Sequence, residues 1–392
     1  MIGVLPLAFD LIRRAWRSGL VAAVGLAVAA AMVWLPTQAS GEALDGGRLA
    51  AVWSLGLGLA QALILTAVAV LAVDGLARDV RDGQAALLAT QPQGRVRWWL
   101  GRWLGAALLG LGWLALAVGV GLIMAGGQVP AAWQEIHAPQ VQPLALPQGT
   151  IVDTGLEGPP GRLRLYLTTP EGDDAAGTLE IHSTTGARQA ITVQPFRTYE
   201  SDWPGGRLGL WQDGWPALVI DPGRDLVLRV PAGSGAANLL RVVVLLALQV
   251  LFVAALGAAA AGALRYPLAL LAVLAWLFAA AHAPLLSSSL RPPGAQEEEL
   301  LAHGHHADDG HDHGVSEGWW LEVLEGARLT GWSLTDALHR WWRVGDLGAG
   351  RLVPGAEVGQ ALLRLGLLQT VAVAVAGILL WRRRELALGD ES

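Results

Sequence analysis

The chain contains no cysteine and no lysine, and only 15% of its 392 residues are charged. Without cysteine it can form no disulfide, no thiolate metal site and no cysteine nucleophile. All 27 basic residues are arginine, which excludes a Walker A loop within these residues, because that loop holds nucleotide phosphates with a lysine. Any ATP chemistry would therefore be carried by another chain.

Charge is scarcest in six long apolar stretches, in a chain that is 53% hydrophobic with a mean hydropathy of +0.43. A soluble protein usually has about 25% charged residues, and a helix needs about 20 mainly apolar residues to cross a membrane. The stretches approach or exceed that length and are rich in small residues, which let packed helices approach closely. They cover residues 20–35, 49–73, 103–125, 239–264, 268–285 and 361–381. We therefore predict a membrane all-α bundle of six transmembrane helices.

The segment before the first stretch has an amphipathic pattern. Leu5, Phe9, Ile12 and Trp16 recur at helical spacing, and charged residues stand between them. Such a pattern is typical of a helix that lies in the membrane interface. We interpret residues 1–18 as this helix, and the stretch after it as a retained span rather than a cleaved signal peptide.

The distribution of arginine predicts the orientation in the membrane. The termini and short connections hold 12 Arg and 7 acidic residues, whereas the long connections 126–236 and 286–358 hold 12 Arg and 24 acidic residues. Because cytoplasmic loops carry an excess of basic residues, both termini are predicted to be cytoplasmic in a bacterial inner-membrane protein. Five tryptophans fall at predicted span ends, as expected of an aromatic belt: Trp34, Trp98, Trp99, Trp103 and Trp381.

Residues 126–236 change to an alternating pattern typical of strands. Runs such as 162–167 and 225–230 place apolar residues at every second position, and turns rich in Gly and Pro separate the runs. Several short strands at this spacing are typical of an antiparallel sandwich. We predict an inserted extracytoplasmic β-sandwich-like domain, with a protein partner outside the membrane as one expected role.

The predicted organisation follows from these segments. It comprises the interfacial helix 1–18, spans one to three within 19–125 with a cytoplasmic loop at 74–102, the β-rich domain 126–236, spans four and five within 237–285, an outer segment 286–358, the sixth span within 359–381 and a tail 382–392.

Histidine and aspartate are concentrated between residues 303 and 313, which hold five His and three Asp. Imidazole and carboxylate together suit Zn²⁺ or Cu²⁺. The candidate metal ligands are His303, His305, His306, Asp308, Asp309, His311, Asp312 and His313. Two interpretations fit: a flexible acidic loop that binds metal adventitiously, or a physiological metal sensor or collector. Tryptophan pairs at 319–320 and 341–342 predict short helices on the outer membrane surface.

The loop between the second and third spans is the most informative segment. A short helix over 84–90 is predicted between Gly83 and Pro92. Its apolar side, formed by Leu87 and Leu88, would point into the cytoplasm, as suits a peg that docks on a soluble partner. The alternative is an ordinary amphipathic loop helix that folds back on the bundle.

This loop resembles the coupling-helix region of type-2, exporter-class ABC transporter permeases. The family shows an acidic and arginine-containing stretch, then Gly, Leu, Pro and Arg in that order, then L-G-(K/R)-x-x-G at the start of the third span. The matching residues are Gly83, Leu87, Leu88, Pro92, Arg95, Leu100, Gly101 and Arg102. The sequence R-R-E-L at 383–386 and the N-terminal helix, which is similar to the family's elbow helix, agree with this. Within the family, the chain is similar to the multi-copper enzyme maturation permeases.

The resemblance implies a non-catalytic transport subunit that has no cofactor of its own. It implies a second permease copy and separate ATPase subunits as partners, and these ATPases would bind ATP and Mg²⁺. The residues assigned to ATPase coupling are Arg78, Asp79, Arg81, Asp82, Gly83, Leu87, Leu88, Pro92 and Arg95. Membrane lipid is a further expected partner, and no nucleic acid is expected.

Two other functions are compatible with parts of the sequence. A metal-ion carrier with a His-rich loop needs ligands inside its spans, and the spans offer few polar side chains and no paired carboxylate. Those side chains are Gln61, Gln249, His282, Gln360, Arg364 and Gln369. The other function is a membrane-anchored sensor or assembly factor with an extracytoplasmic β-domain, for which six spans exceed what an anchor needs.

Overall fold

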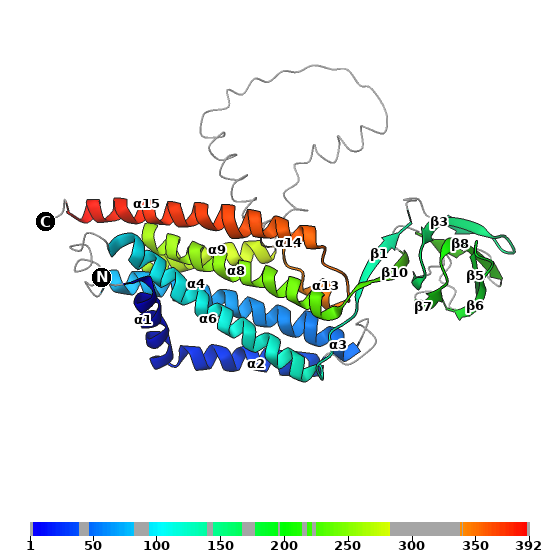
Figure 1. The fold of residues 1–392 in the computed structure, drawn as a ribbon, viewed down its shortest axis with the longest axis horizontal. Coiled ribbons are helices and arrows are strands. Elements are labelled where there is room, and N and C mark those ends of the chain that lie inside the picture. The colour runs from blue at the N-terminus through cyan, green and yellow to red at the C-terminus, as the bar shows by residue number, and fades with distance from the viewer. Residues whose placement is uncertain are drawn as a thin grey trace, which may run out of the picture. The chain divides into compact units, whose positions relative to one another are not determined.

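The computed structural model describes residues 3–38, 47–81, 94–138, 144–166, 177–194, 197–213, 218–221, 225–282, 338 and 340–389, with backbone alone at 94–95, 218 and 382–389. The chain divides into two compact units. The helical unit comprises Met1–Val129, Leu239–Gly348 and Val353–Ser392, and the β unit comprises Pro130–Asn238 and Ala349–Leu352. Figure 1 shows the helices and strands of these units.

Five helices among the described residues are long and apolar enough to cross a membrane, which indicates a membrane-embedded protein. They are Leu20–Gln38, Gly47–Arg81, Val96–Met124, Gly235–Ala263 and Gly355–Trp381. The predicted fifth span corresponds to α9 (Tyr266–Ala281), which has only 16 residues. At 1.5 Å per residue α9 is about 24 Å long, shorter than the roughly 30 Å hydrocarbon core. The described residues therefore show five such helices, and not the six that the sequence predicts.

The helical unit contains further short segments between and within the long helices. Its elements are α1 (Val4–Arg17), α2 (Leu20–Gln38), α3 (Gly47–Ala51), the π-helix η1 (Val52–Gly56), α4 (Leu57–Arg81), α6 (Gly94–Met124), α8 (Gly235–Ala263), α9, α13 (Val344–Gly348), α14 (Gly355–Ala361), the π-helix η2 (Leu362–Gln369) and α15 (Thr370–Gly389). The long helices lie side by side, whereas α1 is steeply inclined to them (Figure 1).

Small residues at helix crossings bring the long helices together. A Cβ atom on Gly110 of α6 would lie 2.5 Å from Val68 Cγ2 of α4 and 2.6 Å from Val250 Cγ1 of α8. A Cβ atom on Gly377 of α15 would lie 2.8 Å from the Cα atom of Ala259 in α8. These separations leave no room for a side chain, so the richness in small residues is used for close packing.

The predicted aromatic belt is wrong for three of its five tryptophans. Trp98, Trp99 and Trp381 are 1%, 1% and 2% exposed, so they face the interior of the unit. Trp98 meets Trp381 edge-on, with ring centroids 5.0 Å apart, and this contact joins α6 to α15. Trp34 is 61% exposed. A position near a span end does not by itself tell which way a ring faces.

The β unit consists of antiparallel sheets. Its strands are β1 (Ala132–His137), β2 (Leu144–Leu146), β3 (Val152–Gly158), β4 (Gly161–Tyr166), β5 (Gly177–Ser183), β6 (Arg188–Val193), β7 (Thr198–Trp203), β8 (Gly206–Asp213), β9 (Leu218–Ile220) and β10 (Leu226–Gly233). The strand orders are β1-β10-β4-β7, β3-β8-β5-β6 and β2-β9.

One hydrophobic core is shared by the two larger sheets, as in a sandwich. Leu163 of β4 pairs with Leu228 of β10, and both side chains are fully buried. Ile181 of β5 pairs with Leu210 of β8 on the other sheet and enters the same core. The alternating runs of the sequence thus form strands with one buried face, as their period of two predicts.

Residues 349–352, which the sequence analysis placed in a separate outer segment, belong to the β unit. The Trp133 backbone N–H donates to Gly350 O at 2.7 Å, and the Leu352 N–H donates to Trp133 O at 2.8 Å. The Arg351 guanidinium lies 2.8 Å from the Glu135 carboxylate. These contacts fasten the segment to β1.

Candidate functional site

The predicted coupling peg lies outside the described residues. This holds for Asp82, Gly83, Leu87, Leu88 and Pro92, and the Arg95 side chain is likewise not described. The structure does describe the two stems of the loop, since α4 ends at Arg81 and α6 begins at Gly94. The candidate site therefore consists of the two stems and of α1, which packs against them.

The centre of the site is Asp79, two residues before the end of α4. Its side chain is fully buried. Its Oδ1 accepts a hydrogen bond from Arg14 Nη1 at 2.9 Å, and its Oδ2 accepts from Trp98 Nε1 at 2.9 Å and Arg102 Nε at 2.7 Å. A buried carboxylate is tolerated when it is paired and hydrogen-bonded in this way. The donors come from α1 and α6, so Asp79 joins three helices.

A second carboxylate, Asp10 of α1, completes the cluster. It accepts from Arg14 Nη2 at 2.7 Å and from Arg102 Nη1 at 2.9 Å. Arg102, only 2% exposed, also donates to Leu7 O at 3.3 Å. Two carboxylates and two guanidiniums thus alternate with no net charge. We call Asp10, Arg14, Asp79 and Arg102 the junction network.

The charge of Asp10 is maintained by its partners. Partial burial alone would raise the pKa of this carboxyl, but the hydrogen bond from Arg102 and the positive charges of Arg102 and Arg14 outweigh it. The pKa of Asp10 is consequently lowered from its ordinary value. Asp10 therefore stays ionised at neutral pH, and the pairing with both arginines is retained.

Two glycines of α6 allow α1 to reach the network. A Cβ atom on Gly101 would lie 2.5 Å from Leu7 Cβ, and one on Gly105 would lie 2.9 Å from Ala8 O. Gly101 directly precedes Arg102 and Gly105 lies almost one turn after it, so no side chain at either position keeps the α1 backbone away from α6. The L-G-R-x-x-G sequence thus has a physical role here, which is to dock α1.

The structure divides the predicted coupling residues into two groups. Arg78 and Arg81 are exposed in the last turn of α4, whereas Asp79 is enclosed by its three donors. The prediction that Asp79 makes a polar contact around the peg is corrected accordingly, because no surface of its carboxylate is accessible to a partner. Asp79 instead links the α4 stem to the α6 stem and to α1.

Sequence reasoning missed the participation of Asp10, Arg14 and Trp98. Asp10 and Arg14 are four residues apart and face the same side of a helix, which is a visible signal of an ion pair. Their partners are 65 or more residues away along the chain, as in the bond from Arg14 to Asp79. The sequence pattern around Asp10 and Arg14 does not show which distant residues are their partners.

Three of the polar residues predicted inside the spans make contacts within the helical unit. Gln61 Nε2 donates to Gln249 Oε1 and to Leu246 O, both at 3.2 Å. His282 Nδ1 lies 2.9 Å from Phe278 O, and the two rings stack. Among the described residues no group of three or more potential metal ligands occurs, and the His-rich residues 303–313 lie outside them.

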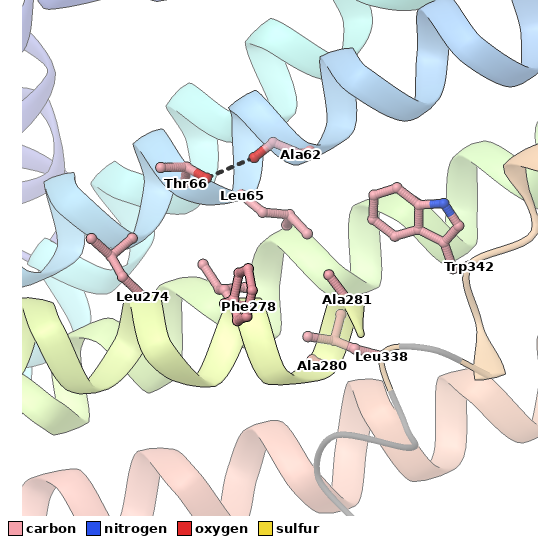
Figure 2. Close-up of a pocket in the computed structure, with 10 residues that line it drawn as sticks. Ala62, Leu65, Thr66, Leu274, Phe278, Ala280, Ala281, Leu338 and Trp342 are labelled. Atoms are coloured by element: carbon pink, nitrogen blue, oxygen red, sulfur yellow. Dashed lines mark hydrogen bonds between the residues drawn. The ribbon is translucent and has the colours of Figure 1, made fainter. Parts of the chain in front are cut away.

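An apolar cavity of about 550 Å³ lies between α4 and α9. Leu65 of α4 points toward α9, and Leu274 and Phe278 of α9 point toward α4 (Figure 2). The hydroxyl of Thr66 donates to Ala62 O at 2.9 Å, so it is already satisfied by its own helix. The lining residues are Ala62, Leu65, Thr66, Leu274, Leu277, Phe278, Ala280, Ala281, Leu338 and Trp342. Such a lining suits a hydrocarbon chain rather than a polar ligand.

In chemical terms the junction network is a linkage and contains no nucleophile. It fixes an amphipathic helix to both stems of one loop. A comparison with protein-family models and with curated proteins finds no match to this chain.

Proposed function

We propose that the chain is the membrane-spanning permease subunit of an ABC transporter, and that the junction network transmits movement of the 82–93 loop to the helices. The observation that carries the proposal is the position of the network at both stems of that loop. Asp79 is three residues before the start of the loop, and Trp98 and Arg102 follow its other end within three helical turns.

The network makes the two stems and α1 one mechanical body. Breaking a buried ion pair by losing one partner costs about 3–5 kcal/mol, because the other charge is left uncompensated. A force on the loop is therefore expected to displace α1, α4 and α6 together rather than to separate them. Rigid-body movement of this kind is a standard way to convert a local event into rearrangement of packed helices.

The remaining parts of the proposal follow the sequence resemblance. A second permease copy would pack against the chain, and separate ATPase subunits would bind ATP and dock on Leu87 and Leu88. The β unit would lie outside the bacterial inner membrane, with both termini in the cytoplasm. If α1 lies in the membrane interface on the cytoplasmic side, it would be on the same side of the membrane as the ATPases.

The first test is association with an ATPase. The tagged chain is purified from its native membranes, and vanadate-sensitive ATP hydrolysis in the eluate is measured. Burying two leucines contributes about 2–5 kcal/mol to association, scaled from roughly 1.5–3 kcal/mol for each. Leu87→Asp with Leu88→Asp should therefore lower the affinity roughly 30-fold to several-thousandfold and remove the hydrolysis.

The control is Ile151→Asp, which adds one negative charge, half that of the double variant, at an exposed apolar residue of the β unit. It should leave the co-purifying hydrolysis at the wild-type level. A wild-type chain that brings no ATP hydrolysis with it would refute the proposal. An unstable double variant would instead show that this helix folds back on the bundle.

Sidedness is tested separately with reporter fusions. The proposal places residue 172 outside and residue 390 inside, so fusions at Gly172 and Asp390 should report opposite sides. The same side for both would contradict this orientation.

A further inference from the structure

Three arginines line a small pocket at the end of the helical unit. Arg78 and Arg81 of α4 face Arg265 and Tyr266 at the start of α9 across a space of about 160 Å³. All three arginine side chains are exposed, and among the described residues no carboxylate lines the pocket. Guanidinium groups bind phosphate oxygens through paired, charge-assisted hydrogen bonds, and the tyrosine hydroxyl adds a further donor. The donors of this pocket thus suit a phosphate group.

The start of α9 adds to the positive character of this pocket. Arg265 is the N-cap residue of α9, and no side chain caps the helix there. The first backbone N–H groups of a helix have no partner within it, and the helix dipole makes this end positive. A phosphate held by the arginines would therefore also be favoured by α9.

The apolar cavity between α4 and α9 lies farther along the same two helices. From Arg78 to Thr66 on α4 is about 18 Å, and from Tyr266 to Leu274 on α9 is about 12 Å, at 1.5 Å per residue. Half of the hydrocarbon core of a bilayer is about 15 Å thick. The cavity therefore begins at the depth that the chain of a lipid reaches when its phosphate lies in the arginine pocket.

The two features also share one face of α4. Ala77 and Val80 line the arginine pocket, and Ala62 and Thr66 line the apolar cavity. At about 100° per residue, positions 62, 66, 77 and 80 fall within about 60° of one another around the helix axis. A molecule with a phosphate at one end and a hydrocarbon chain at the other matches both.

From this geometry we infer that the chain binds an anionic phospholipid, with its phosphate at Arg78, Arg81 and Arg265 and a hydrocarbon chain in the cavity lined by Leu65, Leu274 and Phe278. This inference does not depend on the proposed transport function. A free phosphate ion would use the pocket alone, whereas a phospholipid uses both the pocket and the cavity.

The test is native mass spectrometry of the full chain in detergent, titrated with dioleoyl phosphatidylglycerol. Replacing the three pocket arginines together (Arg78→Gln, Arg81→Gln and Arg265→Gln) should weaken binding at least tenfold. The matched control replaces three exposed arginines of other segments, Arg48→Gln, Arg188→Gln and Arg197→Gln. It removes the same charge and should leave binding within twofold of wild type. Equal losses in both triple variants would overturn the proposal, because they would show a general effect of charge.

Two further arms identify the source of the phosphate. Phosphatidylcholine with the same chains should bind at least tenfold more weakly, and equal binding would overturn the headgroup assignment. Millimolar inorganic phosphate should not displace the lipid; displacement would show a site for a soluble anion instead.

The position of the lipid's hydrocarbon chain is tested with Ala62→Phe, which places an aromatic ring in the cavity. It should weaken phosphatidylglycerol binding at least tenfold, and unchanged binding would refute the position of the chain. Thermal unfolding without lipid checks that each variant is folded. The triple lysine variant at the same three positions keeps the charge, and it should recover part of the binding; a failure to recover any would contradict phosphate recognition there.

Discussion

The junction network makes a quantitative prediction about the loss of one arginine. Replacing Arg102 with Met keeps an unbranched apolar stem and removes the guanidinium group with its charge. Asp79 then keeps Arg14 and Trp98 as donors, but one guanidinium faces two carboxylates. Because Arg102 is 2% exposed and Asp79 is fully buried, the unbalanced charge is poorly solvated. We expect Arg102→Met to destabilise the helical unit by about 3–5 kcal/mol.

The double variant separates the ion pair from simple packing. Asp79→Asn together with Arg102→Met removes one charge of each sign and leaves Asp10 paired with Arg14. The combined loss should be smaller than the sum of the two single losses by at least about 1.5 kcal/mol, which is within the range of directly contacting groups. The control is Arg207→Met, because the ion pair of Arg207 with Asp153 is about half exposed on both sides. It should cost less than about 1 kcal/mol.

The absence of cysteine makes a direct structural assay available. Leu5→Cys on α1 and Leu108→Cys on α6 place one pair of spin labels at exposed positions, with no background labelling. The distance distribution should be narrow in the wild type, broad with Arg102→Met, and narrow again in the double variant. Unfolding in mixed micelles with increasing dodecyl sulfate gives the free energies. If Arg102→Met costs no more than Arg207→Met, or if the two single losses simply add, the network does not hold α1.

Three other predictions concern the same chain. Gly101→Val should displace α1 and cost about 1–3 kcal/mol, because a Cβ atom there would lie 2.5 Å from Leu7 Cβ, whereas Gly112→Ala, with nothing within 4 Å, should be neutral in the same unfolding assay. The pKa of Asp10 is lowered in the folded state, so ionised Asp10 stabilises the fold fully above the ordinary carboxyl pKa of about 3.9. This stabilisation is lost as the pH falls through the lower folded pKa. Asp10→Asn should therefore remove this part of the acid dependence of the spin-label distance. Residues 303–313 should bind Zn²⁺ or Cu²⁺ in calorimetry with an affinity that falls below about pH 6, where imidazoles protonate, and their deletion should leave the unfolding curve unchanged; failure of the deleted chain to assemble in membranes would contradict the flexible-loop interpretation.

The secondary structure was largely visible in the sequence because each element has one dominant cause. The run 162–167 alternates strictly, and its Leu163 and Leu165 are the buried side of β4. The apolar stretch 49–73 predicted a span, but α4 continues to Arg81. This extension comes from tertiary contacts, since Asp79 is stabilised by side chains of other helices. A search for apolar stretches could not detect this extension, because residues 74–81 include charged side chains.

The arrangement of the β unit was less accessible. β10 lies between β1 and β4, so strands far apart in the chain pair with one another. Alternation tells which face of a strand is buried and carries no information about its neighbour. The same limit explains residues 349–352, which are too short to show a pattern and are fixed to β1 by their backbone and by Arg351.

The junction network shows why a glycine spacing and a buried arginine should be interpreted together. In a chain with 50 glycines, the Gly101 and Gly105 pair taken alone has little weight. Arg102 lies between them, and its guanidinium reaches Asp79 of α4 and Asp10 of α1. The glycines bring the α1 backbone close enough for this pairing, and the pairing compensates the burial of Arg102. The glycines and Arg102 thus contact α1 together, and the five residues from Gly101 to Gly105 form one docking site for α1. We therefore expect a movement of the loop stems to displace α1 as well.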